Sequence, residues 1–330
     1  MSALPSPAAG AQPAPVPTQR RLALSNHIPA LVLLALCAAA TLVSDRFLTA
    51  ANLGNVLLQA SILTVLAIGM SFVIVCGGFD LSVGSTAALS GCLAAMAIFH
   101  AGLGDGAGLV VAIGTGCLVG ALNGWIVGRL RVSPLIATLG TMVLVRGAAL
   151  LVTDGAPVQS NDEVTGLLAL IGTGQVFGVP VLPCAVALVC VASYWLLHHS
   201  TLGFRIFAVG GNEQAAAIVG IRVVRVKLYA YTICGALAGF AGFLLTARLQ
   251  SGQPTAGEFY ELTAIAAVVL GGASLKGGEG RLLNSIVGVF IMVLLNNILN
   301  LAGVGTYWQR VAVGVVIVAA AAADQLRHRR

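Results

Sequence analysis

The stretch Leu202–Lys227 reads LGFRIFAVGGNEQAAAIVGIRVVRVK, a short polar and basic interval between two long apolar runs. Within it, Asn212 is a good N-cap for a helix, and Glu213 puts a negative charge in the first turn, where the helix dipole favours it. Gly220 is a typical stop in the left-handed conformation. The pattern therefore predicts a helix of about two turns, roughly 10 Å long.

This short helix cannot span a bilayer and is marginal alone in water, so we expect it to lie at the membrane surface, packed against another body. Its body comprises Gln214, Ala215, Ala216, Ala217, Ile218 and Val219. The alanines form a thin face that a partner's groove can accept, and we expect Ala216 to lie nearest to that partner. Gly210 and Gly211 are expected to give a flexible entry. An ordinary loop that happens to be capped remains the alternative.

The composition is that of a membrane protein. Hydrophobic residues make up 58% of the chain and charged residues 8%, whereas roughly a quarter of the residues of a soluble domain are charged. The net charge of +6 comes from few residues. We interpret this basicity as a topology signal and not as a nucleic-acid surface.

Counting apolar runs of about 17 to 25 residues predicts an all-α protein with about ten membrane spans. The runs lie near residues 28–44, 55–76, 82–100, 107–127, 135–153, 180–197, 228–248, 262–274, 282–300 and 307–323. The transmembrane domain is thus predicted to cover residues 28–323. Residues 1–27, rich in Pro and Ala, are predicted to be a disordered cytoplasmic tail, and residues 324–330 a basic cytoplasmic C-terminus.

The basic residues predict the orientation. With the N-terminus inside, only Arg46, Arg248 and Arg310 fall in outer segments and only Arg146 within a span, so the rest of the 17 Lys and Arg residues are cytoplasmic. This asymmetry favours ten spans with both termini inside. Arg20 and Arg21 before an apolar run resemble a signal peptide, but the run continues to the first outer loop, and we expect it to stay uncleaved.

The segment Gly77–Ser85, GGFDLSVGS, joins the second and third spans. Asp80 or Ser82 can cap the third helix, or the two can line the inner mouth of a pathway, and both roles can hold together. Arg146 lies roughly 16 Å into the fifth span with no acidic partner in a span. A buried arginine is costly and marks a functional site by default. A purely structural role for it stays open.

Further polar residues at depth are Asn123, Thr138, Thr141, Asn296, Asn297 and Asn300. Such residues glue helices together more often than they bind substrate, so they are candidates for the pathway with helix packing as the alternative. The chain has no G-x-x-x-x-G-K-[ST] phosphate loop, and its histidines and seven cysteines show no metal-binding spacing. The sequence therefore predicts no catalytic site, no metal and no cofactor.

Five stretches together resemble the permease subunit of bacterial ATP-binding-cassette (ABC) sugar importers of the ribose, xylose and galactose type. They are GGFDLSVGS, the Asn123-Gly124 pair, PLIATLGTMVLVRG, GFRIFAVGGNEQAAAIVGIRV and LTAIAAVVLGGASLKGGEGR. The resemblance covers most of residues 45–323 and implies a type II importer permease fold in a bacterial inner membrane. Each stretch is modest alone, but all five occur in the order of that family.

The resemblance implies three protein partners: a cytoplasmic ATPase, a periplasmic sugar-binding protein and a second permease copy, with ATP hydrolysis on the separate ATPase. The helix after Asn212 would then be the coupling helix that docks on the ATPase. Two alternatives stay open: a branched-chain amino-acid permease of the same superfamily, and an ion-coupled secondary transporter, although the spans carry no clear acid or His relay.

Overall fold

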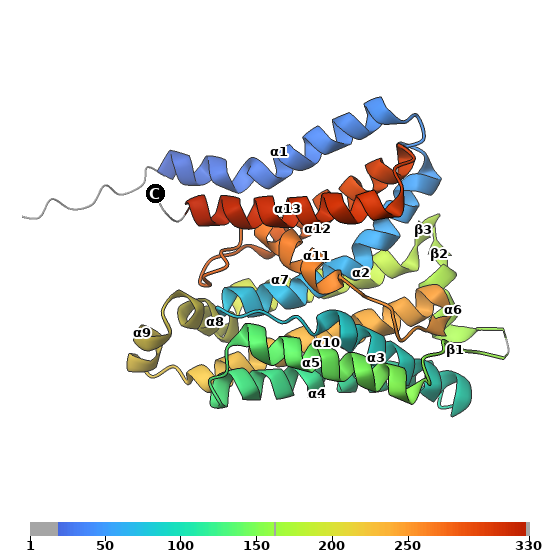
Figure 1. Cartoon of the computed structure of the whole chain (residues 1–330), viewed down its shortest axis with the longest axis horizontal. Coiled ribbons are helices and arrows are strands. Elements are labelled where there is room, and N and C mark those ends of the chain that lie inside the picture. The colour runs from blue at the N-terminus through green and yellow to red at the C-terminus, as the bar shows by residue number, and fades with distance from the viewer. Residues whose placement is uncertain (1–18, 162, 328–330) are drawn as a thin grey trace, which may run out of the picture.

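The computed structural model describes residues 19–161 and 163–327 and is almost entirely helical (Figure 1). In chain order the elements are α1 (Gln19–Val43), α2 (Ala50–Val75), α3 (Val83–Ala95) with a π-helical end η1 (Met96–His100), α4 (Asp105–Arg129), α5 (Pro134–Val152), β1 (Val158–Gln159), α6 (Gly166–Thr173), β2 (Gln175–Val176), β3 (Val179–Pro180), α7 (Val181–His199), α8 (Thr201–Gly211), α9 (Glu213–Ile218), α10 (Val223–Leu249), β4 (Ser251–Gly252), α11 (Tyr260–Leu270), α12 (Leu282–Leu301) and α13 (Thr306–Arg327).

Seven of the described helices are long and apolar enough to cross a membrane: α2, α3 with η1, α4, α5, α7, α10 and α12. The first, eighth and tenth predicted spans correspond to α1, α11 and α13, whose apolar stretches are shorter. Helix α1 begins at Gln19, and α13 runs to Arg327. Residues 1–18 of the predicted disordered tail lie outside the described residues, whereas its residues 19–27 are helical in α1.

One predicted loop is a helix. Residues 202–211, expected to be a polar approach with a flexible glycine pair, form most of α8. Gly210 serves close packing instead of flexibility, because a Cβ there would collide with the carbonyl oxygen of Val75 at the end of α2. The prediction of a flexible entry was wrong because two glycines also permit two backbones to touch.

The helices differ in how much of their surface the protein itself covers. Of the most apolar window of α2, 89% is buried, against 22% for α7. An apolar helix that its neighbours leave exposed must be covered by another body, and in a membrane protein that body is lipid or a further subunit. Helix α2 is thus the centre of the bundle, and α7 lies at its periphery.

Helix α4 packs along α10 more extensively than any other pair of described elements. Small residues allow this approach, since a Cβ at Gly116 would collide with the Gly235 carbonyl oxygen and one at Gly120 with that of Tyr231. Helices in lipid gain no hydrophobic attraction for one another, so close backbone approach supplies the van der Waals contact that holds them. Glycines four residues apart on α4 therefore create the main seam of the bundle.

The connecting segments gather at two opposite ends (Figure 1). At one end, β1 pairs antiparallel with β4, and the carboxylate of Asp105 accepts a hydrogen bond of 2.9 Å from the backbone N–H of Leu168. At the other end lie α8 and α9, where the N–H of Gly278 donates to the carbonyl of Val75 at 2.9 Å. Each of these contacts joins two loops or helix ends that the ten predicted spans place on the same side of the membrane.

Candidate functional site

The short helix α9 has the cap and the stop that the sequence predicted. The side-chain oxygen of Asn212 accepts a hydrogen bond of 2.9 Å from the N–H of Ala215. Gly220 ends the turn with φ at +86°, in the left-handed region that favours glycine. Glu213 also forms an ion pair of 2.6 Å with Lys227, which ties the first turn of α9 to the first turns of α10.

The prediction that Ala216 faces a partner was wrong. Its side chain is only 4% exposed and lies in an internal cluster with Ile206 of α8 and Val226 of α10. The alanine is small because the helix must sit closely on its own chain. The sequence could not distinguish an internal neighbour from an external one, since both require a small residue.

The outward face of α9 carries the apolar residues instead. Ile218 is 86% exposed and Val219 is 75% exposed, at the end of the helix opposite to Asn212. Glu213, Gln214 and Ala215 are exposed as well. Ile218 and Val219 thus give the outward face of α9 a small apolar surface next to the polar first turn.

Asp80, Ser82 and Asn123 form one buried polar cluster. One carboxylate oxygen of Asp80 accepts hydrogen bonds from the N–H and the hydroxyl of Ser82, at 2.9 and 2.6 Å, and from the side-chain amide of Asn123 at 3.2 Å. Asn123 also donates to the hydroxyl oxygen of Ser82 at 2.9 Å. Burial raises the pKa of the Asp80 carboxyl above its usual value, and the hydrogen bonds from Ser82 and Asn123 offset only part of this increase.

This cluster is not the helix cap that the sequence offered as one reading. Ser82 is the N-cap residue of α3, but its side chain accepts no cap hydrogen bond, and Asp80 bonds Ser82 instead of the first turn. The cluster joins the loop after α2 to α4 near its Arg129 end. The carbonyl oxygen of the Asn123 side chain is buried without a hydrogen-bond partner among the described residues.

The other predicted pathway residues do not join this cluster. The hydroxyls of Thr138 and Thr141 donate to the carbonyls of Pro134 and Ala137 in their own helix, at 2.8 and 2.9 Å. Asn296 is half-buried on α12. Its neighbour Asn297 instead exchanges side-chain hydrogen bonds with Asn52 of α2, at 2.8 and 3.2 Å, so this asparagine run joins two helices.

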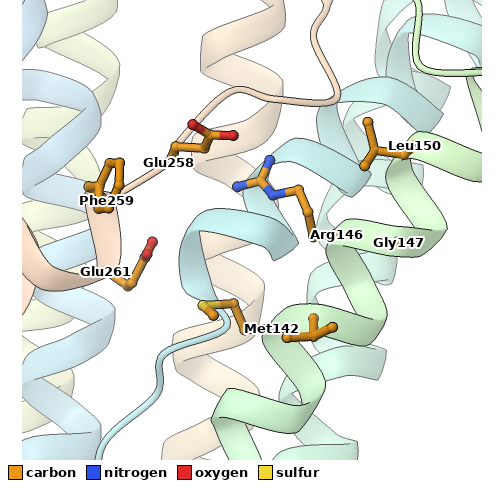
Figure 2. Close-up of a pocket in the computed structure, with 8 residues that line it drawn as sticks. Met142, Arg146, Gly147, Leu150, Glu258, Phe259 and Glu261 are labelled. Atoms are coloured by element: carbon orange, nitrogen blue, oxygen red, sulfur yellow. The ribbon is translucent and has the colours of Figure 1, made fainter.

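Arg146 reaches out of α5 toward the segment between β4 and α11 (Figure 2). One guanidinium nitrogen donates to the carbonyl oxygens of Pro254 and Ala256, at 2.6 and 2.9 Å. Backbone carbonyls are therefore direct partners of this arginine, which an inspection of the spans for acids could not reveal. Acidic groups are also near, because Glu258 and Glu261 line the same pocket as Arg146.

These groups line a pocket of about 390 Å³. Its walls are Met142, Val143, Arg146, Gly147, Leu150, Glu258, Phe259 and Glu261. The volume falls in the range of small-molecule sites, which combine apolar walls with a few polar groups. Glu261 is only 9% exposed. Figure 2 shows Arg146 extending from α5 toward the side of the pocket that carries Glu258 and Glu261.

Sequence reasoning missed the two glutamates of this pocket. Both lie between the predicted spans 228–248 and 262–274, whereas Glu261 belongs to the first turn of α11. The available signal was a pair of acidic residues at the start of a short apolar run, of which only Glu261 lies on α11. The partners on α5 lie more than a hundred residues away in the chain, and only the fold brings them together.

Comparison with known proteins places the chain in a family. The family described as branched-chain amino acid transport system / permease component matches residues 52–321. The chain belongs to this permease family. No solved structure matches the permease.

The permease resembles curated relatives along nearly its whole length. It is 43% identical over 295 residues to the ribose import permease protein RbsC of Escherichia coli (strain K12), covering 89% of this chain and 92% of the relative. It is 44% identical to RbsC of Bacillus subtilis (strain 168), with coverages of 90% and 92%. The L-arabinose transport system permease protein AraH of Escherichia coli (strain K12) is 35% identical, with coverages of 86% and 85%.

The family match includes every candidate site residue of the permease, from Asp80 to Asn296. The permease is a multi-pass membrane protein. Both the α9 end and the Arg146 pocket lie within the residues that match the family. The relatives carry sugars in their names, whereas the family description names branched-chain amino acids, so the substrate class is argued separately below.

Proposed function

We propose that this permease is the membrane subunit of an ATP-driven importer that moves a monosaccharide or a related small polyol. The observation that carries the proposal is the 43% identity, over 92% of the relative's length, to a ribose import permease. Arabinose and xylose permeases follow, at 35% and 32% identity. Substrate specificity can change among such relatives, so the proposal names a class and no single sugar.

In this proposal about ten helices span the bacterial inner membrane, with both termini in the cytoplasm and a type II importer arrangement. Three predicted spans are short, yet α1, α11 and α13 are apolar and extend the bundle. The end that carries α9 is cytoplasmic, because Arg205, Arg222 and Arg225 gather there. The paired β1 and β4 then belong to the outer face.

The proposal assigns one protein partner to each end and a further copy alongside. An ABC ATPase docks on the exposed residues of α9, with Ile218 and Val219 as its apolar anchors. A periplasmic sugar-binding protein docks on the outer segments around β1 and β4. A second permease copy completes the channel in the bilayer, and ATP is hydrolysed on the ATPase, since this chain lacks a phosphate loop.

We assign two places in the pathway. The pocket around Arg146 lies toward the outer end, where Arg146, Glu258 and Glu261 offer both donors and acceptors to sugar hydroxyls. The buried cluster of Asp80 and Asn123 lies toward the α9 end and holds the loop after α2 in place. We assign a packing role to Thr138, Thr141 and Asn296, because the two threonines are buried and bond their own helix and Asn296 is half-buried.

Uptake in a reconstituted system tests the function. Permease, ATPase and binding protein from the same organism are placed in vesicles, and uptake of labelled ribose, arabinose, xylose, galactose, leucine and valine is measured with and without ATP. We expect ATP-dependent uptake of at least one sugar. Uptake of leucine or valine alone would establish the amino-acid alternative, and uptake that needs an ion gradient but no ATPase would establish the secondary transporter.

A further inference from the structure

A second hollow, of about 480 Å³, lies at the α9 end of the molecule and shares Val219 with the proposed ATPase-docking surface. Its wall is built by α8, by the turn after α9 and by the first turns of α10. Arg205, Arg222 and Arg225 line it together with Leu202, Val219, Gly220, Ile221, Val226 and Tyr229. Three arginines therefore line one hollow that has no acidic side chain in its lining.

The three arginines are exposed, and their charges remain available to a ligand. The one salt bridge among the described residues joins Lys227 to Glu213 and involves none of them. The guanidinium group presents a planar fork of donors that matches the oxygens of a phosphate group. A cluster of three such groups is thus complementary to a phosphate ester.

Exposed aromatic rings show at which depth the hollow lies. Tyr229, which lines it, is 50% exposed, Trp195 of α7 is 62% exposed and Trp125 of α4 is 50% exposed. Each lies four to six residues from the helix end nearest α9, or about 6 to 9 Å along the axis. Gly128 of α4 faces Val224 of α10, which places these helix ends together.

Exposed Trp and Tyr rings near span ends mark the headgroup level of a membrane. Because Tyr229 is one of these rings and also lines the hollow, the hollow opens at the depth of lipid phosphates. Phe204 of α8, 73% exposed, adds an apolar surface beside Arg205 for the upper part of an acyl chain. An anionic headgroup and its chains would both be accommodated.

We propose that the hollow lined by Arg205, Arg222 and Arg225 binds the phosphate headgroup of an anionic phospholipid. Basic pockets between membrane helices on the cytoplasmic side bind such headgroups. The lipid packs between α8, α10 and the turn that ends α9, so it supports the orientation of that short helix. The inference depends on the chain spanning a membrane and is independent of which solute it transports.

Lipid titration of the purified full chain tests this. Delipidated permease is titrated with phosphatidylglycerol or phosphatidylcholine, and bound lipid is counted by native mass spectrometry. We expect preferential binding of phosphatidylglycerol. Arg222→Gln with Arg225→Gln should weaken it about 25-fold, at roughly fivefold for each arginine. Replacement of both by Lys should weaken it less, because the charge stays and the fork is lost.

The matched control is Arg129→Gln, which removes an exposed arginine at the same end but outside the hollow. It should bind phosphatidylglycerol like the unchanged protein. Equal weakening by Arg129→Gln, or equal binding of both lipids, would overturn the proposal. So would displacement of the lipid by inorganic phosphate at equal concentration, which would assign the hollow to a free anion. Unchanged lipid binding with lost ATPase co-purification would assign the arginines to the ATPase.

Discussion

Truncating Ile218 gives the sharpest test of how α9 acts. The side chain is 86% exposed, so nearly all of its apolar surface is available to a partner. Burying an isoleucine fully contributes about 1.5 to 3 kcal/mol. If the ATPase covers it, Ile218→Ser should therefore weaken association by about 2 kcal/mol, or roughly 30-fold. The fold should be unaffected, because exposed positions without special contacts change stability little.

The opposite behaviour is expected of Ala216, two residues earlier. Its side chain is 4% exposed within the cluster of Ile206 and Val226. Ala216→Arg places a long charged side chain into packed apolar surface, which costs about 3 kcal/mol or more. Membrane abundance of this variant should fall. The two neighbouring substitutions thus separate loss of docking from loss of folding.

The assay measures the amount of ATPase that co-purifies with tagged permease over a range of ATPase concentrations, alongside permease abundance in the membrane. Leu103→Ser serves as control, since Leu103 is an exposed leucine, 61% open, at the opposite end of the molecule. Unchanged ATPase affinity in Ile218→Ser would refute the assignment of α9 as the docking element. Lost abundance in that variant would refute the exposed placement of Ile218.

Three further predictions concern the bundle and the Arg146 pocket. Gly120→Val should lower the melting temperature in detergent, at a cost of about 1 to 3 kcal/mol, because its side chain would collide with α10, whereas Gly114→Val on the same helix meets nothing within 4 Å and should melt normally. Asn297→Leu should destabilise by about 0.6 kcal/mol through loss of its pair with Asn52, and the double replacement by Leu should recover part of this in a thermal double-mutant cycle; additive losses would disprove the coupling. Arg146→Met should free the segment before α11 and raise its proteolytic cleavage from the outer side; an unchanged cleavage rate would exclude the tether.

Local features of this protein could be predicted from the sequence because their physical causes are local. The cap at Asn212, the left-handed end at Gly220 and the position of each long apolar helix follow from a few neighbouring residues and from the length of an apolar run. The five ordered stretches also indicated the permease family that the comparisons show. None of this depended on how the helices pack.

The packing of distant segments was decided by the tertiary structure alone. Ala216 is small because it packs against a neighbour within the chain, and Gly210 because α2 touches it. From the sequence alone, the glycine is equally consistent with flexibility and the alanine with a face for a partner. Arg146 is satisfied by the carbonyls of Pro254 and Ala256, which no pattern of side chains can display. The size and polarity of a side chain indicate what kind of environment it occupies, but only the fold determines which residues form that environment.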